Sequence, residues 1–222
     1  MNLALVRLLH LASPTLPVGA YTYSQALEWA VESGAVDNEA SAGRWIGDCL
    51  SGSLASCEAV YLAHMLAAWQ SGDRARLQAL DLEFIASRET AELRAETLQM
   101  GHSLVKLLGD LAEFDVATLA ALAPASFPLA WSCAAARWNI GREDAIAGYL
   151  WSWLENQVMA ALKAVPLGQT AGQRLLLGLG ERLPDLARQA AAAPLDASRN
   201  FLPAFAIASS LHETQYTRIF RS

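Results

Sequence analysis

The sequence predicts an all-α fold, a single-domain bundle of roughly ten helices that spans residues 1–222. Apolar residues recur at intervals of three and four along most of the chain, which places them on one face of a helix. Glycine, proline and Ser-Gly pairs interrupt this pattern at intervals typical of helix lengths. The sequence contains no strand-like alternation longer than four residues, no internal repeat and no flexible linker.

The first elements are bounded by local signals. Residues 2–11 carry a helical stripe of apolar residues, and the two prolines and the glycine in residues 13–19 predict an ordered loop. A short helix is expected over residues 24–33, with Gly34 as its C-terminal cap.

A long helix and two charged segments follow. Asp37 is a plausible N-cap for a helix that runs to about Trp69. Residues 73–96 are rich in charge, which favours a solvated helix face. A further helix is expected over residues 89–108, with its end at Gly109.

Residues 116–136 carry no charge and have nearly the length of a membrane span. Pro124 and Pro128 interrupt this segment, so two short helices around a turn are expected in place of a span. The second of these helices is predicted to reach Ile140 and to be capped by Gly141.

The helix expected over residues 144–165 is apolar on both sides, which is typical of a helix that is buried or that packs on two sides. Gln157 lies in the middle of one apolar face and is predicted to be a buried amide with a structural role. Without hydrogen-bond partners it would cost about 1–3 kcal/mol. Glu155 on the other side could pair inside the protein or face a partner.

Composition limits the possible functions. Apolar residues make up 54% of the chain and charged residues 17%, which indicates either surface left over for an oligomer or partner interface, or an Ala-rich helical core. A net charge of −6 argues against a nucleic-acid binder. Three cysteines at unrelated spacings indicate neither a disulfide framework nor a zinc module, and they favour a reducing cytoplasm.

No catalytic or metal-binding pattern is evident. The four histidines do not form the helical pairs that bind metals. Cys57, Tyr61 and His64 share one helix face, but two good ligands make a weak metal site and a packed core stripe is favoured. A small helical metal enzyme is therefore only a third hypothesis.

Residues 168–174 resemble a phosphate-binding loop, but the glycine spacing is too short and Gln173-Arg174 replaces the required Lys and Ser/Thr. Gly168 is expected to help end one helix, and Thr170 to cap the next. This helix start could receive an acidic group of a partner, or it could be an ordinary connection between helices.

The end of the chain has the composition of an interface. Tyr216, Ile219 and Phe220 alternate with Arg218 and Arg221. Aromatic residues and arginines are the side chains that most often dominate protein interfaces.

Three motifs in this order resemble the urease accessory protein UreF family. They are residues 11–29, residues 153–157 with 166–174, and residues 207–209 with 212–222. Between about residues 34 and 145 the similarity rests on length and helicity alone. The resemblance implies an all-helical homodimer without catalytic activity and without a tightly held cofactor or metal. Such a protein joins UreD (UreH) and the nickel-carrying GTPase UreG on apo-urease.

The resemblance also implies two sets of partner-binding residues. The tail, residues 214–222, is expected to bind UreD. The residues that match the family's motif there are Tyr216, Arg218, Phe220 and Arg221. The residues expected to bind UreG, or to form the dimer core, are Gln169, Thr170, Gln173 and Arg174.

Two positions depart from the family pattern, because Ala206 and Leu211 stand where acidic and basic residues are expected. The tail is predicted to be disordered until a partner binds. As an alternative function, the protein would regulate the GTPase through an arginine such as Arg174 or Arg218.

Overall fold

The computed structural model describes residues 2–111, 113–114, 117, 121 and 124–222, and every regular element within these ranges is a helix. The prediction of an all-α bundle is therefore confirmed. The elements in chain order are α1 (Leu3–Leu11), η1 (Ala20–Thr22), α2 (Leu27–Glu32), α3 (Glu39–Cys49), η2 (Leu50–Glu58), α4 (Ala59–Ser71), α5 (Arg74–Ala86), α6 (Ala91–Asp110), α8 (Phe127–Arg137), α9 (Arg142–Ala164), α10 (Gln169–Gly180), α11 (Leu183–Ala192), η3 (Leu195–Ala197) and α12 (Pro203–His212).

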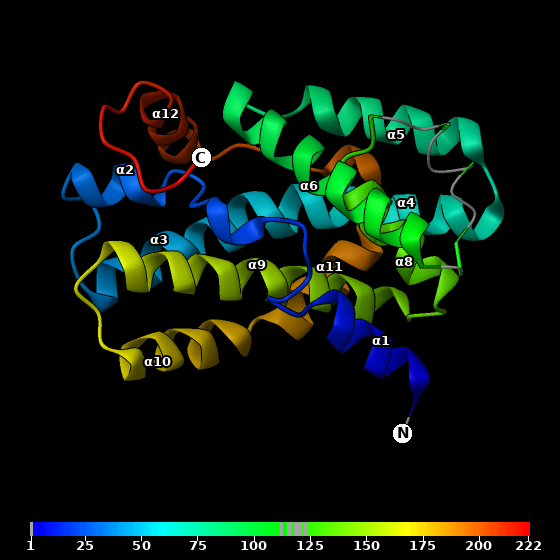
Figure 1. The fold of residues 1–222 in the computed structure, drawn as a ribbon, viewed down its shortest axis with the longest axis horizontal. Coiled ribbons are helices and arrows are strands. Elements are labelled where there is room, and N and C mark those ends of the chain that lie inside the picture. Colours follow the sequence, from blue (N-terminus) through cyan, green and yellow to red (C-terminus); the bar gives the residue numbers. More distant parts are fainter. Residues whose placement is uncertain (1, 112, 115–116, 118–120, 122–123) are drawn as a thin grey trace.

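Helix α9 runs through the middle of the molecule and contacts α10, α11, α4, α2 and α1 (Figure 1). Neighbours on several sides explain why its sequence is apolar all round. Ile146, Leu150, Leu154 and Val158 are all fully buried. The expectation that this helix packs on more than one side is confirmed.

The long helix predicted after residue 37 is present as α3, η2 and α4, which follow one another without a break. Its N-cap is Asn38 and not Asp37. The Asn38 side chain accepts a hydrogen bond from the Ser41 amide (3.0 Å), and the Ser41 hydroxyl accepts one from the Asn38 amide (3.1 Å). The middle segment, η2, is π-helical, and its last residue, Glu58, is buried. Such π-helical turns are frequent at functional sites.

Several helices begin or end at residues whose backbone adopts the left-handed conformation. Gln25 and Ala26 have positive φ, so α2 begins at residue 27 and not at residue 24. Gly34 follows the end of α2 with φ of 78°, as predicted. Helix α8 ends before Ile140 because Asn139 takes the left-handed conformation, and Gly141 is the N-cap of α9.

Of the two short helices predicted in residues 116–136, the first lies outside the described residues. The second is α8, in which Ser126 is the N-cap and Pro128 lies in the first turn. In the part of the chain that the structure describes, no helix combines the length and the apolar content needed to cross a bilayer.

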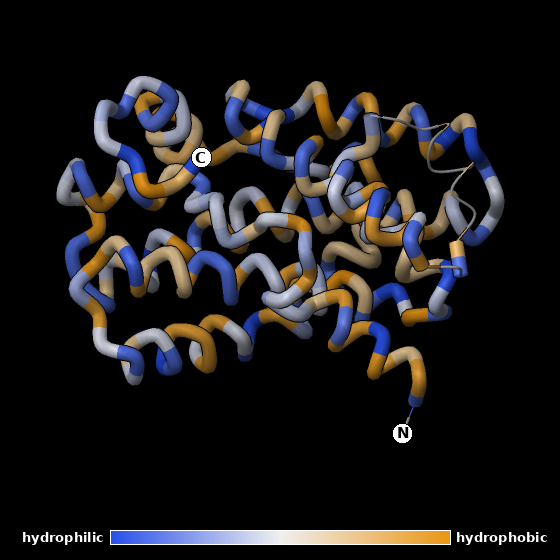
Figure 2. The backbone as a smooth tube through the Cα atoms, viewed as in Figure 1, coloured by the Kyte–Doolittle hydropathy of each residue, from blue (hydrophilic) through white to orange (hydrophobic). Residues whose placement is uncertain are grey.

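The alternation of hydrophobic and hydrophilic residues along the helices is visible in Figure 2. In the core, the rings of Phe127, Trp131 and Tyr149 lie with centroids 5.3 to 5.7 Å apart. The C-terminus lies close to α2 and α12 and on the side toward α6 (Figure 1). This arrangement positions the candidate site.

Candidate functional site

Residues 213–222 fold back over α2 toward α6 and α9 (Figure 1). Glu28 of α2 holds this segment by its backbone. Its Oε1 atom accepts a hydrogen bond from the Ile219 amide (2.6 Å), and its Oε2 atom accepts one from the Phe220 amide (2.9 Å). Hydrogen bonds to a charged acceptor are about twice as strong as neutral ones, so Glu28 fixes the path of the tail.

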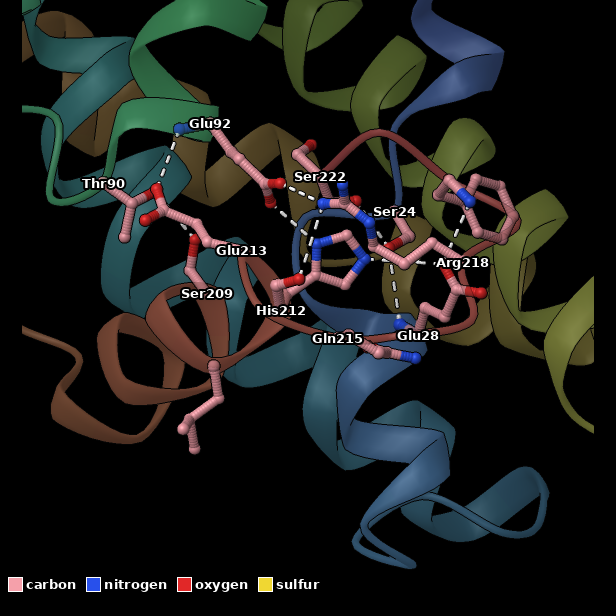
Figure 3. A network of polar contacts seen from close by, with 12 residues as sticks. Ser24, Glu28, Thr90, Glu92, Ser209, His212, Glu213, Gln215, Arg218 and Ser222 are labelled. Atoms are coloured by element: carbon pink, nitrogen blue, oxygen red, sulfur yellow. Dashed lines mark hydrogen bonds and ion pairs between the residues drawn. The ribbon is translucent and has the colours of Figure 1, made fainter.

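A fully buried histidine joins the tail to two helices (Figure 3). The Nδ1 atom of His212 lies 2.7 Å from Glu92 Oε2, and its Nε2 atom lies 3.4 Å from Glu28 Oε2. Arg218 forms an ion pair with the other oxygen of Glu92. These four residues, Glu28, Glu92, His212 and Arg218, are called the His212 network below. They connect α2, the first turn of α6, the end of α12 and the tail.

Ser222, at the end of the tail, is also held by hydrogen bonds. Ser222 is only 2% exposed, and its carbonyl oxygen accepts hydrogen bonds from the amide and the hydroxyl of Ser24, both at 2.7 Å. Its own hydroxyl donates to Glu96 Oε2 (2.7 Å). The neighbouring Phe220 is buried, with the Lys163 ammonium 5.6 Å from the centre of its ring. The prediction of a disordered tail is therefore wrong, because two carboxylates that the sequence pattern did not reveal hold it: Glu28 binds its backbone and Glu96 binds the Ser222 side chain.

The predicted tail residues divide into two groups. Tyr216 is fully exposed and Ile219 is 69% exposed, so both can meet a partner. Phe220 is buried in the protein's own core, and Arg218 is engaged in the His212 network. Arg221 is exposed, and its amide donates to the Thr22 carbonyl (2.8 Å).

The predicted central motif forms the start of α10. Its N-cap is Gly168 and not Thr170, which lies within the first turn. Thr170, Gln173 and Arg174 are exposed on the outer side of α10, as is Gln169. Arg174 binds Glu39 of α3 through two hydrogen bonds, Nε to Oε1 (2.8 Å) and Nη2 to Oε2 (2.5 Å).

A model of the UreF family matches residues 36–180, which is more than half of the chain. The chain belongs to the UreF family. It is 60% identical to the urease accessory protein UreF of Azoarcus sp. strain BH72, over 99% of this chain and 96% of the relative. The corresponding proteins of Dechloromonas aromatica and Methylobacillus flagellatus are 58% and 48% identical, each over 99% of this chain and 98% of the relative.

These relatives are named as accessory proteins and match over nearly their full length, so this member of the UreF family is a urease accessory protein and not an enzyme. The two sets of residues implied by the UreF resemblance lie apart. The tail and α10 are at opposite edges of the view in Figure 1, with α9 between them. They are therefore two separate surfaces and not one site.

Gln157 of α9 is 1% exposed, and its Nε2 atom has no hydrogen-bond partner among the described residues. A structural role for this amide stays a prediction. Glu155, on the opposite side of α9 from Gln157, is half-buried, and burial raises its pKa.

Sequence reasoning missed a buried charged cluster. The Nη1 atom of Arg88 donates to Glu58 Oε1 (2.5 Å), and the Tyr149 hydroxyl donates to Glu58 Oε2 (2.7 Å). Glu96 lies nearby and is only 6% exposed, and the cluster borders a mostly apolar cavity of about 160 Å³. One feature of the sequence could have indicated this cluster: Glu58 is the one charged residue between Asp48 and Asp73.

The three side chains considered for metal binding, Cys57, Tyr61 and His64, make packing contacts and a hydrogen-bond contact to the backbone. Cys57 is buried, and burial raises the pKa of its thiol. The Tyr61 ring packs on Phe84, with centroids 5.5 Å apart, and a ring nitrogen of His64 lies 3.1 Å from the Ala193 carbonyl oxygen. Within the described ranges, no three His, Cys, Asp or Glu side chains are grouped as metal ligands would be.

Proposed function

We propose that this protein is a non-enzymatic assembly factor that scaffolds nickel insertion into apo-urease. It bridges UreD (UreH) and the GTPase UreG, and it acts as a homodimer in the cytoplasm. Nickel is the cargo of the complex and is not held tightly by this chain. Membership of the UreF family and the name shared by its relatives support the link to urease.

The observation that carries the proposal is the anchored tail with exposed apolar side chains. Glu28 and His212 hold the backbone, while Tyr216 and Ile219 face solvent. Large apolar side chains at the surface of a rigid segment are typical interface anchors, because little conformational freedom is lost when a partner binds. Leu211 of α12, 43% exposed, adds apolar area at the position where the family pattern has a basic residue. We assign this surface to UreD.

The outer face of α10 supports a second contact. Thr170, Gln173 and Arg174 share this face with Leu177, which is 70% exposed. One large apolar residue among groups that form hydrogen bonds fits the mixed character of protein interfaces. Because α10 lies away from the tail, UreG or a second copy of the chain can bind here while UreD is bound.

Urease activation in a reconstituted system tests the proposal. A chain that ends at Glu213, and a Tyr216→Ala/Ile219→Ala variant, are expected to lose co-purification with UreD and most urease activation. The double variant removes only exposed groups and leaves the backbone contacts of Glu28 in place, so the protein remains folded. Leu82→Ala on α5, which truncates a side chain that is 60% exposed, is the matched control and should behave as the unmodified protein. Full activation by the truncated chain would contradict the proposal.

The alternative of a GTPase regulator acting through an arginine is less well supported. Arg174 is bound to Glu39, and Arg218 is bound to Glu92, so each would have to break an ion pair before it reached a phosphate. Arg174→Gln would decide between the two functions. In a scaffold, this change should weaken UreG binding and urease activation together, whereas a direct activator should lose its effect on GTP hydrolysis and still bind.

A further inference from the structure

The C-terminal residue covers a carboxyl group that has no ion-pair partner among the described residues. Glu96 accepts hydrogen bonds from Gln25 Nε2 (2.8 Å) and from the hydroxyl of Ser222 (2.7 Å). Arg88, the nearby cation, is bound to Glu58. A carboxylate that is buried without a counter-ion is destabilised relative to its protonated form.

Four ionisable groups from different parts of the described chain lie around Glu96. Arg88 lies between α5 and α6, Glu58 ends η2, Tyr149 belongs to α9, and Tyr23 follows η1. The charge of Glu58 disfavours ionisation of Glu96, and Arg88 opposes this effect. Burial is the largest cause, and together these effects raise the pKa of Glu96 to about 7.

The burial of Glu96 depends in part on the tail. Ser222 is bound to Glu96 directly, and Phe220 is inserted beside Lys163 of α9. If residues 219–222 detach, Glu96 becomes accessible to water and also loses the Ser222 hydroxyl, which favours its ionised form. Burial is the larger of the two effects on the pKa of Glu96, so detachment favours ionisation. We propose that residues 219–222 form a proton-dependent latch, which is docked when Glu96 is protonated and is released when Glu96 ionises.

The direction of the effect follows from linkage. The docked state binds the proton of Glu96 more tightly than the released state, so docking is strongest at low pH and weakens as pH rises through the docked pKa of about 7. If the released pKa is the ordinary value of 4.5, the docking constant falls about tenfold from about pH 6 to about pH 8. Glu28 and His212 also hold the tail, so the test has to change Glu96 alone.

Hydrogen exchange at the Ile219 and Phe220 amides, followed by NMR on the full chain, measures docking. Dividing each observed rate by the intrinsic rate at the same pH gives a protection factor. We expect this factor to fall about tenfold from about pH 6 to about pH 8 in the unmodified protein and to change much less in Glu96→Gln. Glu155→Gln removes another glutamate with a raised pKa, on α9, and should follow the unmodified protein.

A pH-independent protection factor in the unmodified protein, or an equal fall in Glu96→Gln, would overturn the proposal. If Glu96→Gln does not fold, the carboxyl carbon of Glu96 can be titrated by NMR in the unmodified protein and in Phe220→Ala. The weaker tail contact of Phe220→Ala should lower the midpoint, and an unchanged midpoint would also overturn the latch. Both measurements use the chain alone, so their outcome is independent of UreD binding.

Discussion

Replacing Arg88 by methionine is expected to lower the free energy of unfolding by about 3–5 kcal/mol. Arg88 is 5% exposed, and the Cζ atom of its guanidinium lies 4.7 Å from the centre of the Phe84 ring. Burial acts against its charge, but Glu58 and Glu89 outweigh burial and raise its pKa. Methionine fills a similar volume, so the main effect is to leave Glu58 buried as an anion with only the Tyr149 hydroxyl as a donor. Urea unfolding followed by circular dichroism measures the loss.

Two further variants test this explanation. Adding Glu58→Gln to Arg88→Met removes the uncompensated charge, so the double variant should be more stable than the single one. Arg188→Met is the matched control, because Arg188 pairs with Asp185 on the surface, where both side chains are more than half exposed. Its effect should be less than about 1 kcal/mol. A similarly small loss in Arg88→Met would show that the buried pair does not stabilise the fold.

Replacing Gly101 by alanine is expected to cost about 3 kcal/mol, at the upper end of the usual range for overpacking. A β-carbon at this position would lie 2.1 Å from the Ala125 carbonyl oxygen and 2.6 Å from the Ser126 carbonyl carbon. Both are backbone atoms just before α8, so α6 and α8 would have to move apart. Such a shift would also disturb Glu96 and Thr97, one turn earlier on α6. The same unfolding experiment measures the effect.

Gly178→Ala separates the clash from the general effect of removing a glycine. Gly178 lies in α10, and an added β-carbon would meet no atom within 4 Å. This variant should be as stable as the unmodified protein or up to about 1 kcal/mol more stable, because alanine favours helix. If Gly101→Ala were equally stable, the close contact between α6 and the start of α8 would not constrain the fold.

Local sequence signals predicted the helices well. The spacing of apolar residues and the glycine at position 34 depend only on residues close together in the sequence. The structure has a helix at nearly every predicted place. Errors arose where a non-glycine residue adopts the left-handed conformation, as Asn139 and Ala26 do. Alanine rarely adopts this conformation unless the surrounding structure imposes it, so composition alone gives no warning.

The sequence also predicted partner-binding residues in the tail, but not how the tail is held. Tyr216 and Arg218 were predicted to be interface residues from their type. Their partners could not be, because Glu92 lies 126 positions before Arg218. The role of Glu28 could not be predicted either, since a single acidic residue in a short amphipathic helix usually faces water.

The sequence by itself therefore determined the helical fold and the position of the motifs that resemble the UreF family, because both depend on residues close together in the chain. Only the tertiary structure decided that the tail is docked, that Phe220 is buried while Tyr216 is exposed, and that Arg88, Glu58 and Glu96 share one interior. The physical reason is that burial and ion pairing depend on distances between helices. These distances are set when segments far apart in the sequence pack together.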